Sequence, residues 1–210
     1  MDRVVVFGAT GSVGAKVVAS ALQKGFAVRA FVRKGRAGAA RENVEFVEGS
    51  LDDVAAMKAA VAGSAGVVVA LGPRREDPKP FTAKATGNIV RAMAEAGVTR
   101  LVCLTGAMIG DGYPNRGGLY ARMRRGFVKK TPEIAKDRDE QERIVTACPL
   151  DWTVVKPPNV TDGARKGGVR AGTDLKVGMT AKIGREDLAD FLVDQVGKKD
   201  HVKQCVFVMY

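Results

Sequence analysis

The chain has 210 residues, of which 46% are hydrophobic and 27% are charged, a composition that is ordinary for a globular protein. It has one histidine, His201, so a histidine metal cluster is excluded. Its three cysteines are far apart and lack Cys-x-x-Cys spacing, which argues against a zinc site or a disulfide framework. The net charge of +11 raises the question of nucleic-acid binding. No aromatic-interleaved RNA-binding motif or zinc finger accompanies that charge, so nucleic acid is not the predicted partner.

The longest apolar runs, such as residues 66–71, are far too short to cross a bilayer. The first residues lead directly into an apolar run, with no basic segment followed by an apolar signal core. We therefore expect no membrane association and a cytoplasmic location.

Short β-branched apolar runs alternate with longer amphipathic stretches along the chain. The apolar runs predict strands at 3–7, 27–32, 44–47, 66–71, 100–105, 152–155 and 204–208. The amphipathic stretches predict helices at about 12–24, 52–62, 82–96, 134–147 and 185–196. This alternation is typical of an α/β fold: a doubly wound, Rossmann-like parallel sheet in three α/β/α layers.

Two segments break the alternation, residues 107–131 and residues 159–183. Each follows the carboxyl end of a late predicted strand, and ligands of open α/β sheets bind outside those ends. We interpret both segments as long irregular loops on the substrate side. Surface loops without a functional role are the alternative.

A glycine-rich turn joins the first predicted strand to the first predicted helix. Its residues are Gly8, Ala9, Thr10, Gly11, Ser12, Val13 and Gly14. The first glycine permits a tight turn, the second a close approach of the backbone to a pyrophosphate, and the third close packing of helix on strand. The helix N-terminus adds free N–H groups and a partial positive charge. Because the turn has the required strand–turn–helix context, it predicts a dinucleotide site.

The end of the second predicted strand decides the type of dinucleotide. Arg33 stands there, Lys34 and Arg36 follow it, and no acidic residue occurs from Gly25 through Arg41. An arginine at this place accommodates the 2′-phosphate of NADP, whereas an acidic residue would bind the ribose of NAD. We therefore predict NADP(H). The other strand ends supply further candidate cofactor residues: Ser50, Leu51, Ala70, Leu71, Gly72, Thr105, Gly106, Lys156, Pro158 and Asn159.

The G-x-x-G-x-x-G spacing and the strand-end motifs together resemble the atypical short-chain dehydrogenase/reductases of the NAD(P)H-binding, NmrA-like family. Within that family the chain is most similar to the biliverdin-IXβ reductase/flavin reductase group. The motifs that carry the resemblance are Val32-Arg33, Val68-Val69-Ala70-Leu71-Gly72, Gly87-Asn88-Ile89-Val90, Leu104-Thr105 and Val155-Lys156-Pro157-Pro158. The resemblance implies one NAD(P)-binding Rossmann domain over residues 1–210. It also implies NADPH-dependent hydride transfer to an aromatic acceptor of flavin, quinone or tetrapyrrole type.

The chain departs from that group where the group places side chains around a tetrapyrrole. Gly106 stands where serine is usual, Asn159 replaces a histidine, and residues 136–140 contain no histidine. An acidic residue often found at Ser50 is also missing. These departures put biliverdin as the substrate in doubt, and flavin less so.

Catalytic candidates are few. Thr105 offers a hydroxyl near the expected nicotinamide position, and Lys156 could polarise a substrate carbonyl or contact the cofactor ribose. Tyr120 and Arg124 have the four-residue spacing of a Tyr–Lys pair, but arginine stays charged and cannot relay a proton as lysine can. The basic run Arg122, Arg124, Arg125, Lys129 and Lys130 could attract an anionic substrate or form a solvated face.

Two other functions remain open. The absence of a Tyr–Lys pair keeps a non-catalytic NADP(H)-binding sensor of NmrA type as the main alternative. A sugar-nucleotide epimerase or isomerase is weaker, since 210 residues leave little room for a substrate domain. The sequence does not indicate an oligomeric state.

Overall fold

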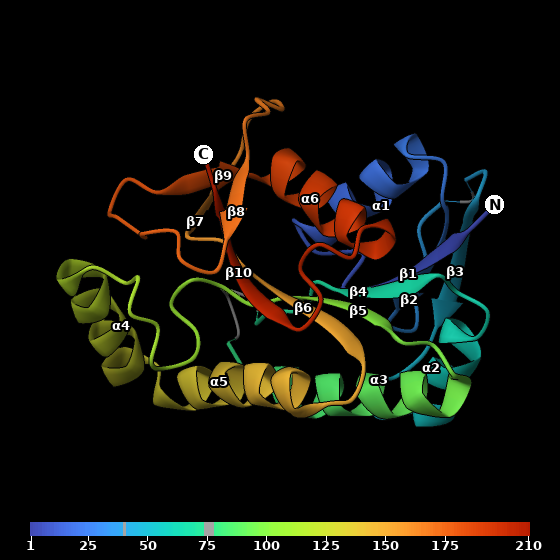
Figure 1. Cartoon of the computed structure of the whole chain (residues 1–210). Helices are drawn as coiled ribbons and strands as arrows, with labels where there is room; N and C mark the ends of the chain where they lie inside the picture. Colours follow the sequence, from blue (N-terminus) through green and yellow to red (C-terminus); the bar gives the residue numbers. More distant parts are fainter. Residues whose placement is uncertain (40, 74–77) are drawn as a thin grey trace.

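The computed structural model describes residues 1–39, 41–73 and 78–210, and Figure 1 shows a sheet between two layers of helices. In these residues the main sheet has eight strands in the order β3-β2-β1-β4-β5-β6-β10-β8, and a separate pair joins β7 to β9. The strands of the main sheet are β1 Arg3–Phe7, β2 Ala27–Val32, β3 Val44–Glu48, β4 Gly66–Val69, β5 Arg100–Leu104, β6 Asp151–Lys156, β8 Arg170–Gly172 and β10 Gln204–Met209. All neighbours are parallel except β8, which pairs antiparallel with β10. The doubly wound α/β prediction is confirmed.

The central strands are apolar at nearly every position because helices cover both faces of the sheet. Val4 and Val6 point to one face, where α1 (Gly14–Gln23) and α6 (Arg185–Gly197) pack. Val5 and Phe7 point to the other face, covered by α2 (Val54–Val61), α3 (Thr82–Ala96) and α5 (Pro132–Ala147). Figure 1 shows these two layers above and below the sheet.

The strand order reverses direction at β1. Its neighbours are β2 on one side and β4 on the other, so the chain winds outward in both directions from this point. A crevice therefore opens at the carboxyl ends of β1 and β4, which is where doubly wound sheets bind ligands.

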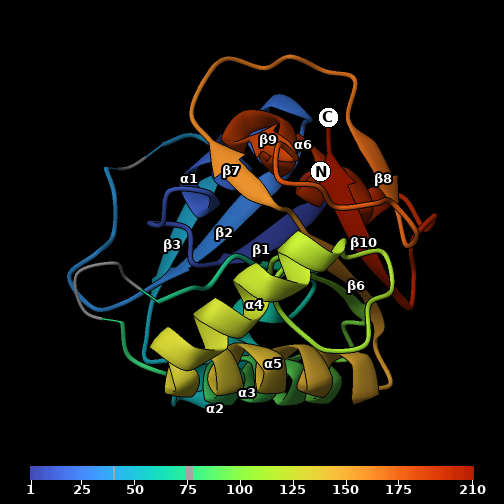
Figure 2. The same cartoon turned by 90° about the vertical axis from the view of Figure 1, so that its left-hand side faces the viewer.

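The two segments expected to be irregular contain a helix and short strands, so the prediction of irregular structure was wrong. Residues 107–131 contain α4 (Gly118–Lys130), and residues 159–183 contain β7 (Asn159–Thr161), β8 and the start of β9 (Lys182–Gly184). This helix was not among the predicted elements, because only Tyr120 and Arg124 of its 13 residues are buried, which leaves no broad apolar stripe. Figure 2 shows α4 lying next to α5, at the end of the sheet that is nearest in that view.

Several element boundaries also differ, among them those of α1, β4 and α5. Helix α1 begins at Gly14 instead of residue 12, because the glycine turn occupies residues 8–13. Strand β4 ends at Val69 instead of residue 71. Helix α5 begins at Pro132 instead of residue 134, and proline is favoured in the first helical turn.

Candidate functional site

The glycine turn places backbone against backbone at two points. Gly8 has φ +89°, and a Cβ there would lie 2.5 Å from the Ala70 carbonyl oxygen. A Cβ on Gly14 would lie 2.7 Å from the carbonyl carbon of Gly8. In the described residues 8–23, no side chain caps α1 and no acidic residue occupies its first turn. The glycines of the turn therefore leave bare backbone at an uncapped helix N-terminus, which suits a phosphate group.

A cavity of 480 Å³ lies in front of this turn, a size typical of small-molecule sites. Its walls come from the turn and from the carboxyl ends of β2, β3 and β4. The lining residues are Gly8, Thr10, Gly11, Phe31, Val32, Arg33, Gly49, Leu51, Ala70, Leu71, Gly72, Lys79 and Phe81. Among these described residues are two cations and no carboxylate, so the cavity favours an anionic ligand.

The loop that carries Arg33 is held by an acid from the neighbouring strand. Glu48 accepts hydrogen bonds from the backbone N–H groups of Gly35 at 3.0 Å and Ala37 at 3.4 Å. Arg36 N also bonds to Arg33 O at 2.9 Å. This carboxylate is therefore used to shape the loop, and it does not line the cavity.

A second group of polar side chains is buried at the carboxyl ends of β5 and β6. The Glu142 carboxylate on α5 accepts hydrogen bonds from Thr105 Oγ1 at 3.1 Å and Tyr113 OH at 2.7 Å, and it forms an ion pair with Lys156. Lys156 Nζ also donates to Ile109 O at 2.8 Å and lies 4.4 Å from the centre of the Tyr113 ring. Glu142 is 5% exposed and Lys156 is 0% exposed. We call Thr105, Tyr113, Glu142 and Lys156 the buried cluster.

Burial controls the acid–base properties of the cluster. Desolvation lowers the pKa of Lys156 from 10.5 to about 8, and the Glu142 carboxylate opposes that shift. Desolvation also raises the pKa of Tyr113, with hydrogen bonds to Cys205 and Glu142 acting in the same direction. Tyr113 therefore stays protonated and donates its hydrogen bond, whereas Lys156 can release a proton near neutral pH.

Arg138 joins the buried cluster to the cavity. Its guanidinium donates to Leu71 O at 2.9 Å and to Thr105 O at 2.7 Å. Since both carbonyl oxygens bind one guanidinium, Thr105 lies beside the end of the cavity that Leu71 lines. Burial lowers the pKa of Arg138, but arginine remains charged in proteins.

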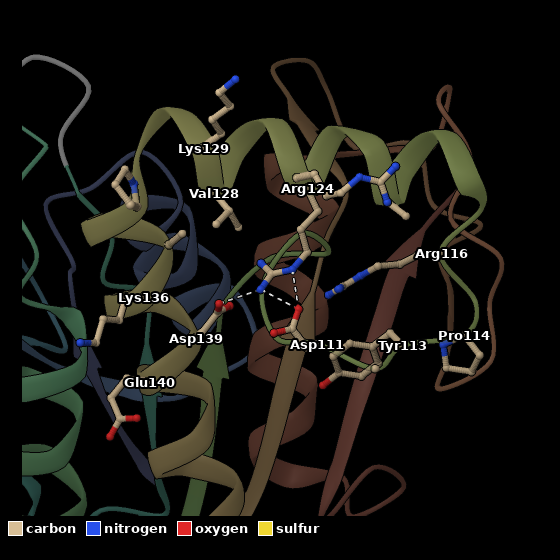
Figure 3. A pocket seen from close by; sticks show the side chains of 15 residues that line it. Asp111, Tyr113, Pro114, Arg116, Arg124, Val128, Lys129, Lys136, Asp139 and Glu140 are labelled. Carbon is tan, nitrogen blue, oxygen red and sulfur yellow. Dashed lines mark hydrogen bonds and ion pairs between the residues drawn. The ribbon is translucent and has the colours of Figure 1, made fainter.

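A larger groove of 1030 Å³ lies between α4, α5 and the loop before α4. Figure 3 shows Arg124 pointing into it toward Asp111 and Asp139, which it binds at 2.9 and 2.7 Å. The half-buried Tyr113 also lines the groove, and its hydroxyl donates to Glu142 of the buried cluster. The groove and the cavity share no lining residue.

Comparisons with known proteins agree with this geometry. The model of a family described as NAD(P)H-binding matches residues 8–199. The chain belongs to the NAD(P)H-binding family. This family assignment confirms the expected cofactor class and agrees with the resemblance seen in the sequence.

Three solved structures share the fold of this family member. A Burkholderia pseudomallei protein, provisionally described as exported, is 27% identical over 100% of both chains with a TM-score of 0.82. A Veillonella parvula short-chain dehydrogenase/reductase in complex with NADP is 14% identical over 100% of this chain and 94% of that one, with a TM-score of 0.81. ChuY of Escherichia coli, described as an anaerobillin reductase, is 19% identical over 99% of this chain and 96% of that one, with a TM-score of 0.79.

The structure brings together many of the residues predicted to bind the cofactor. Gly8, Thr10, Gly11, Arg33, Leu51, Ala70, Leu71 and Gly72 line the cavity. Ala9, Ser12, Val13 and Gly14 belong to the turn without lining it. Ser50 is exposed beside Leu51, and its Oγ accepts a hydrogen bond from Asp52 N at 3.2 Å.

The remaining predicted residues lie at the carboxyl ends of β5 and β6. Thr105 and Lys156 are in the buried cluster, and Gly106 is next to it. Pro158 is half-buried, and Asn159 is exposed at the start of β7. The location of Lys156 was not anticipated: its ammonium contacts protein atoms and is closed off from solvent.

Several site residues escaped the sequence reading. Phe31, Val32, Gly49, Lys79 and Phe81 line the cavity. The first three are at the ends of β2 and β3, whereas Lys79 and Phe81 come directly before α3, where no sequence signal indicated a site. Glu142 and Arg138 stand four apart on α5, a spacing that places both on one face of a helix. Tyr113 has Gly117 instead of a lysine four residues later, yet the fold places Lys156 against its ring.

The Tyr120–Arg124 pair does not have acid–base geometry. Arg124 is 7% exposed and bonds to Asp111, Asp139 and Met108 O. Tyr120 packs in a third apolar cluster with Phe207 and Val177. Arg124 therefore holds the loop before α4, and only the other members of the basic run, Arg122, Arg125, Lys129 and Lys130, are exposed.

No helix among the described residues is both long and apolar enough to span a membrane.

Proposed function

We propose that this protein is an NADPH-dependent reductase that transfers a hydride to a flat aromatic acceptor of flavin, quinone or tetrapyrrole type. The observation that carries the proposal is the 480 Å³ cavity, which has a glycine cradle at one side and Arg33 on its wall. In the described lining no carboxylate is present to bind a ribose 2′-hydroxyl. The activity named for ChuY, an anaerobillin reductase, supports the tetrapyrrole option.

The residues present fit NADPH along the whole cavity. The cradle of Gly8, Gly11 and Gly14 would hold the pyrophosphate, and Arg33 would pair with the 2′-phosphate. Leu71 and Gly72 would lie along the middle of the cofactor, next to Thr105. Bound NADPH supplies the hydride, while the protein supplies binding and orientation.

Arg33 can be tested through binding alone. The variant R33S should lower NADPH affinity roughly 10- to 100-fold, because charge-assisted hydrogen bonds contribute about 1.5–3 kcal/mol. NADH affinity should stay within about twofold, since NADH lacks the 2′-phosphate. Titration calorimetry of both cofactors measures this.

R91S is the matched control, because Arg91 is an exposed arginine on α3 that pairs with Glu95 and does not line the cavity. Equal losses for NADPH and NADH in R33S, or no loss for either, would overturn the NADP preference.

Reductase activity is tested by mixing the protein with NADPH and FMN, menadione or biliverdin and following absorbance at 340 nm. Acceptor-dependent NADPH oxidation, with slower oxidation of NADH, is the expected result. Tight NADPH binding without turnover on any acceptor would instead identify a non-catalytic NADP(H) sensor. The cytoplasmic location remains a prediction that fractionation of the source cells would test.

A further inference from the structure

The two oxygens of Glu142 bind different hydroxyl groups of the buried cluster. Oε1 accepts from Tyr113 OH at 2.7 Å, and Oε2 accepts from Thr105 Oγ1 at 3.1 Å. Lys156 pairs with Oε2. One carboxylate therefore joins two hydroxyls that lie eight residues apart in the connection between β5 and α4, and one lysine pairs with it.

The two ends of this chain of hydrogen bonds lie at different cavities. Thr105 is beside the cofactor cavity, because Arg138 binds its carbonyl together with that of Leu71. Tyr113 lines the groove between α4 and α5, where Figure 3 shows its ring below Arg116. The shared contacts with Glu142 therefore connect an open groove to the carboxyl end of β5 through the protein interior.

We propose that Tyr113, Glu142 and Thr105 form a proton path from the groove to the hydride acceptor, with Lys156 as the buried proton donor that feeds it. The proposal rests on the reductase function given above. It assigns Thr105 as the catalytic residue that touches the acceptor, and Glu142, Lys156 and Tyr113 as residues that act through it.

Each link of the path moves one proton. After the acceptor has taken a hydride, it takes the hydroxyl proton of Thr105, and Thr105 takes a proton from the Glu142 carboxyl group. That carboxyl group received its proton from the Lys156 ammonium, which becomes a neutral amine. Water in the groove then restores the Lys156 proton through Tyr113 and Glu142. The net change is consumption of one NADPH and one solvent proton for each acceptor reduced by two electrons.

The groups around Lys156 suit its role as a proton donor. Glu142 faces it from α5, Tyr113 and Arg116 from the loop before α4, and Cys205 from β10. Burial lowers its pKa to about 8, while Glu142 keeps the ammonium charged at pH 7. A donor whose pKa lies near the working pH is efficient, because it is both protonated and able to release its proton.

The path is cut without disturbing the ion pair by T105V, which removes the hydroxyl and keeps the volume. Its kcat should fall roughly 100-fold, which is the lower range for general acid catalysis, while the Kd for NADPH stays within twofold. T105S should recover most of the rate. T153V is the matched control: Thr153 is a buried strand threonine that binds Arg100, and kcat of this variant should remain unchanged.

The pH profile separates a proton path from a merely structural cluster. In the wild type kcat should fall as pH rises through the pKa of Lys156, and a solvent deuterium effect should accompany it. In T105V the profile should be flat. NMR titration of the Lys156 side chain in cofactor-free protein should give a midpoint near that of the kcat profile. In E142Q the Lys156 midpoint should be lower, because the Glu142 carboxylate favours the ammonium form.

The outcomes separate this path from the reductase function. Turnover with a pH-independent kcat, or a T105V rate equal to wild type, overturns the path alone. A Lys156 midpoint that E142Q leaves unchanged also overturns it. NADPH binding without turnover on FMN, menadione or biliverdin overturns the reductase function, and the path with it. If E142Q does not fold, the double variant E142Q/K156M should show the same flat pH profile as T105V.

Discussion

Replacing Lys156 by methionine tests the buried cluster most directly. The substitution keeps the unbranched chain out to Cε but removes the charge opposite Glu142, which is 5% exposed. Removing one partner of a buried ion pair costs about 3–5 kcal/mol, because the other charge is left uncompensated. Total stabilities are about 5–15 kcal/mol, so K156M should remain folded but be strongly weakened.

The expected change in melting temperature follows from the size of the chain. At about 2–4 °C per kcal/mol for chains of 150–250 residues, K156M should melt roughly 6–20 °C below the wild type at pH 7. The double variant K156M/E142Q should recover at least half of this loss, since no charge is then buried alone. Circular dichroism melts and urea titrations of all four proteins complete a double-mutant cycle.

K198M is the control, because Lys198 pairs with Asp194 on the surface at 3.7 Å and such pairs contribute little. Its melting temperature should stay close to that of the wild type. The reasoning is refuted if K156M melts within about 2 °C of the wild type, or if adding E142Q makes the protein still less stable.

Three further predictions follow from the structure. G14A should raise the Kd for NADPH at least 10-fold and lower the melting temperature, because its Cβ would clash with Gly8; a Kd within twofold of wild type would contradict the cradle. D137A should cost about 1–2 kcal/mol in urea unfolding, because Asp137 caps α3 through the N–H groups of residues 81–83 at 2.9–3.1 Å; an unchanged midpoint would contradict this. The pKa of Lys156 is lowered in the folded state, so the unfolded chain binds more protons between pH 8 and about 10.5. The wild type should therefore gain stability relative to K156M/E142Q as pH rises through this window, and a difference that is constant with pH would exclude the shift.

The parts of the fold that depend on local sequence were predicted well. Val4 to Phe7 form a fully apolar, fully buried run of three valines and a phenylalanine, which is typical of a strand covered on both faces. Gly8 adopts φ +89° and Gly14 leaves no space for a Cβ, so the conformation of the turn is specified by the residues within it. Arg33 was identified because it directly follows its strand, and it lines the cavity.

The elements that depend on distant contacts were missed. Helix α4 buries only Tyr120 and Arg124, and its position depends on Asp111 and Asp139. Strand β7 has three residues, and its partner β9 lies more than 20 residues later. No local periodicity specifies these contacts, because α4 has only two buried residues and β7 has only three residues in all.

The sequence by itself determined the doubly wound sheet, the glycine cradle and the basic residue that favours a 2′-phosphate. Only the tertiary structure decided the chemistry beside the cofactor. Glu142 lies 37 residues from Thr105, 29 from Tyr113 and 14 from Lys156, yet it contacts all three. The physical reason is that parallel strands gather their carboxyl ends at one edge of the sheet, so residues far apart in the chain meet there and shift one another's pKa through burial and charge.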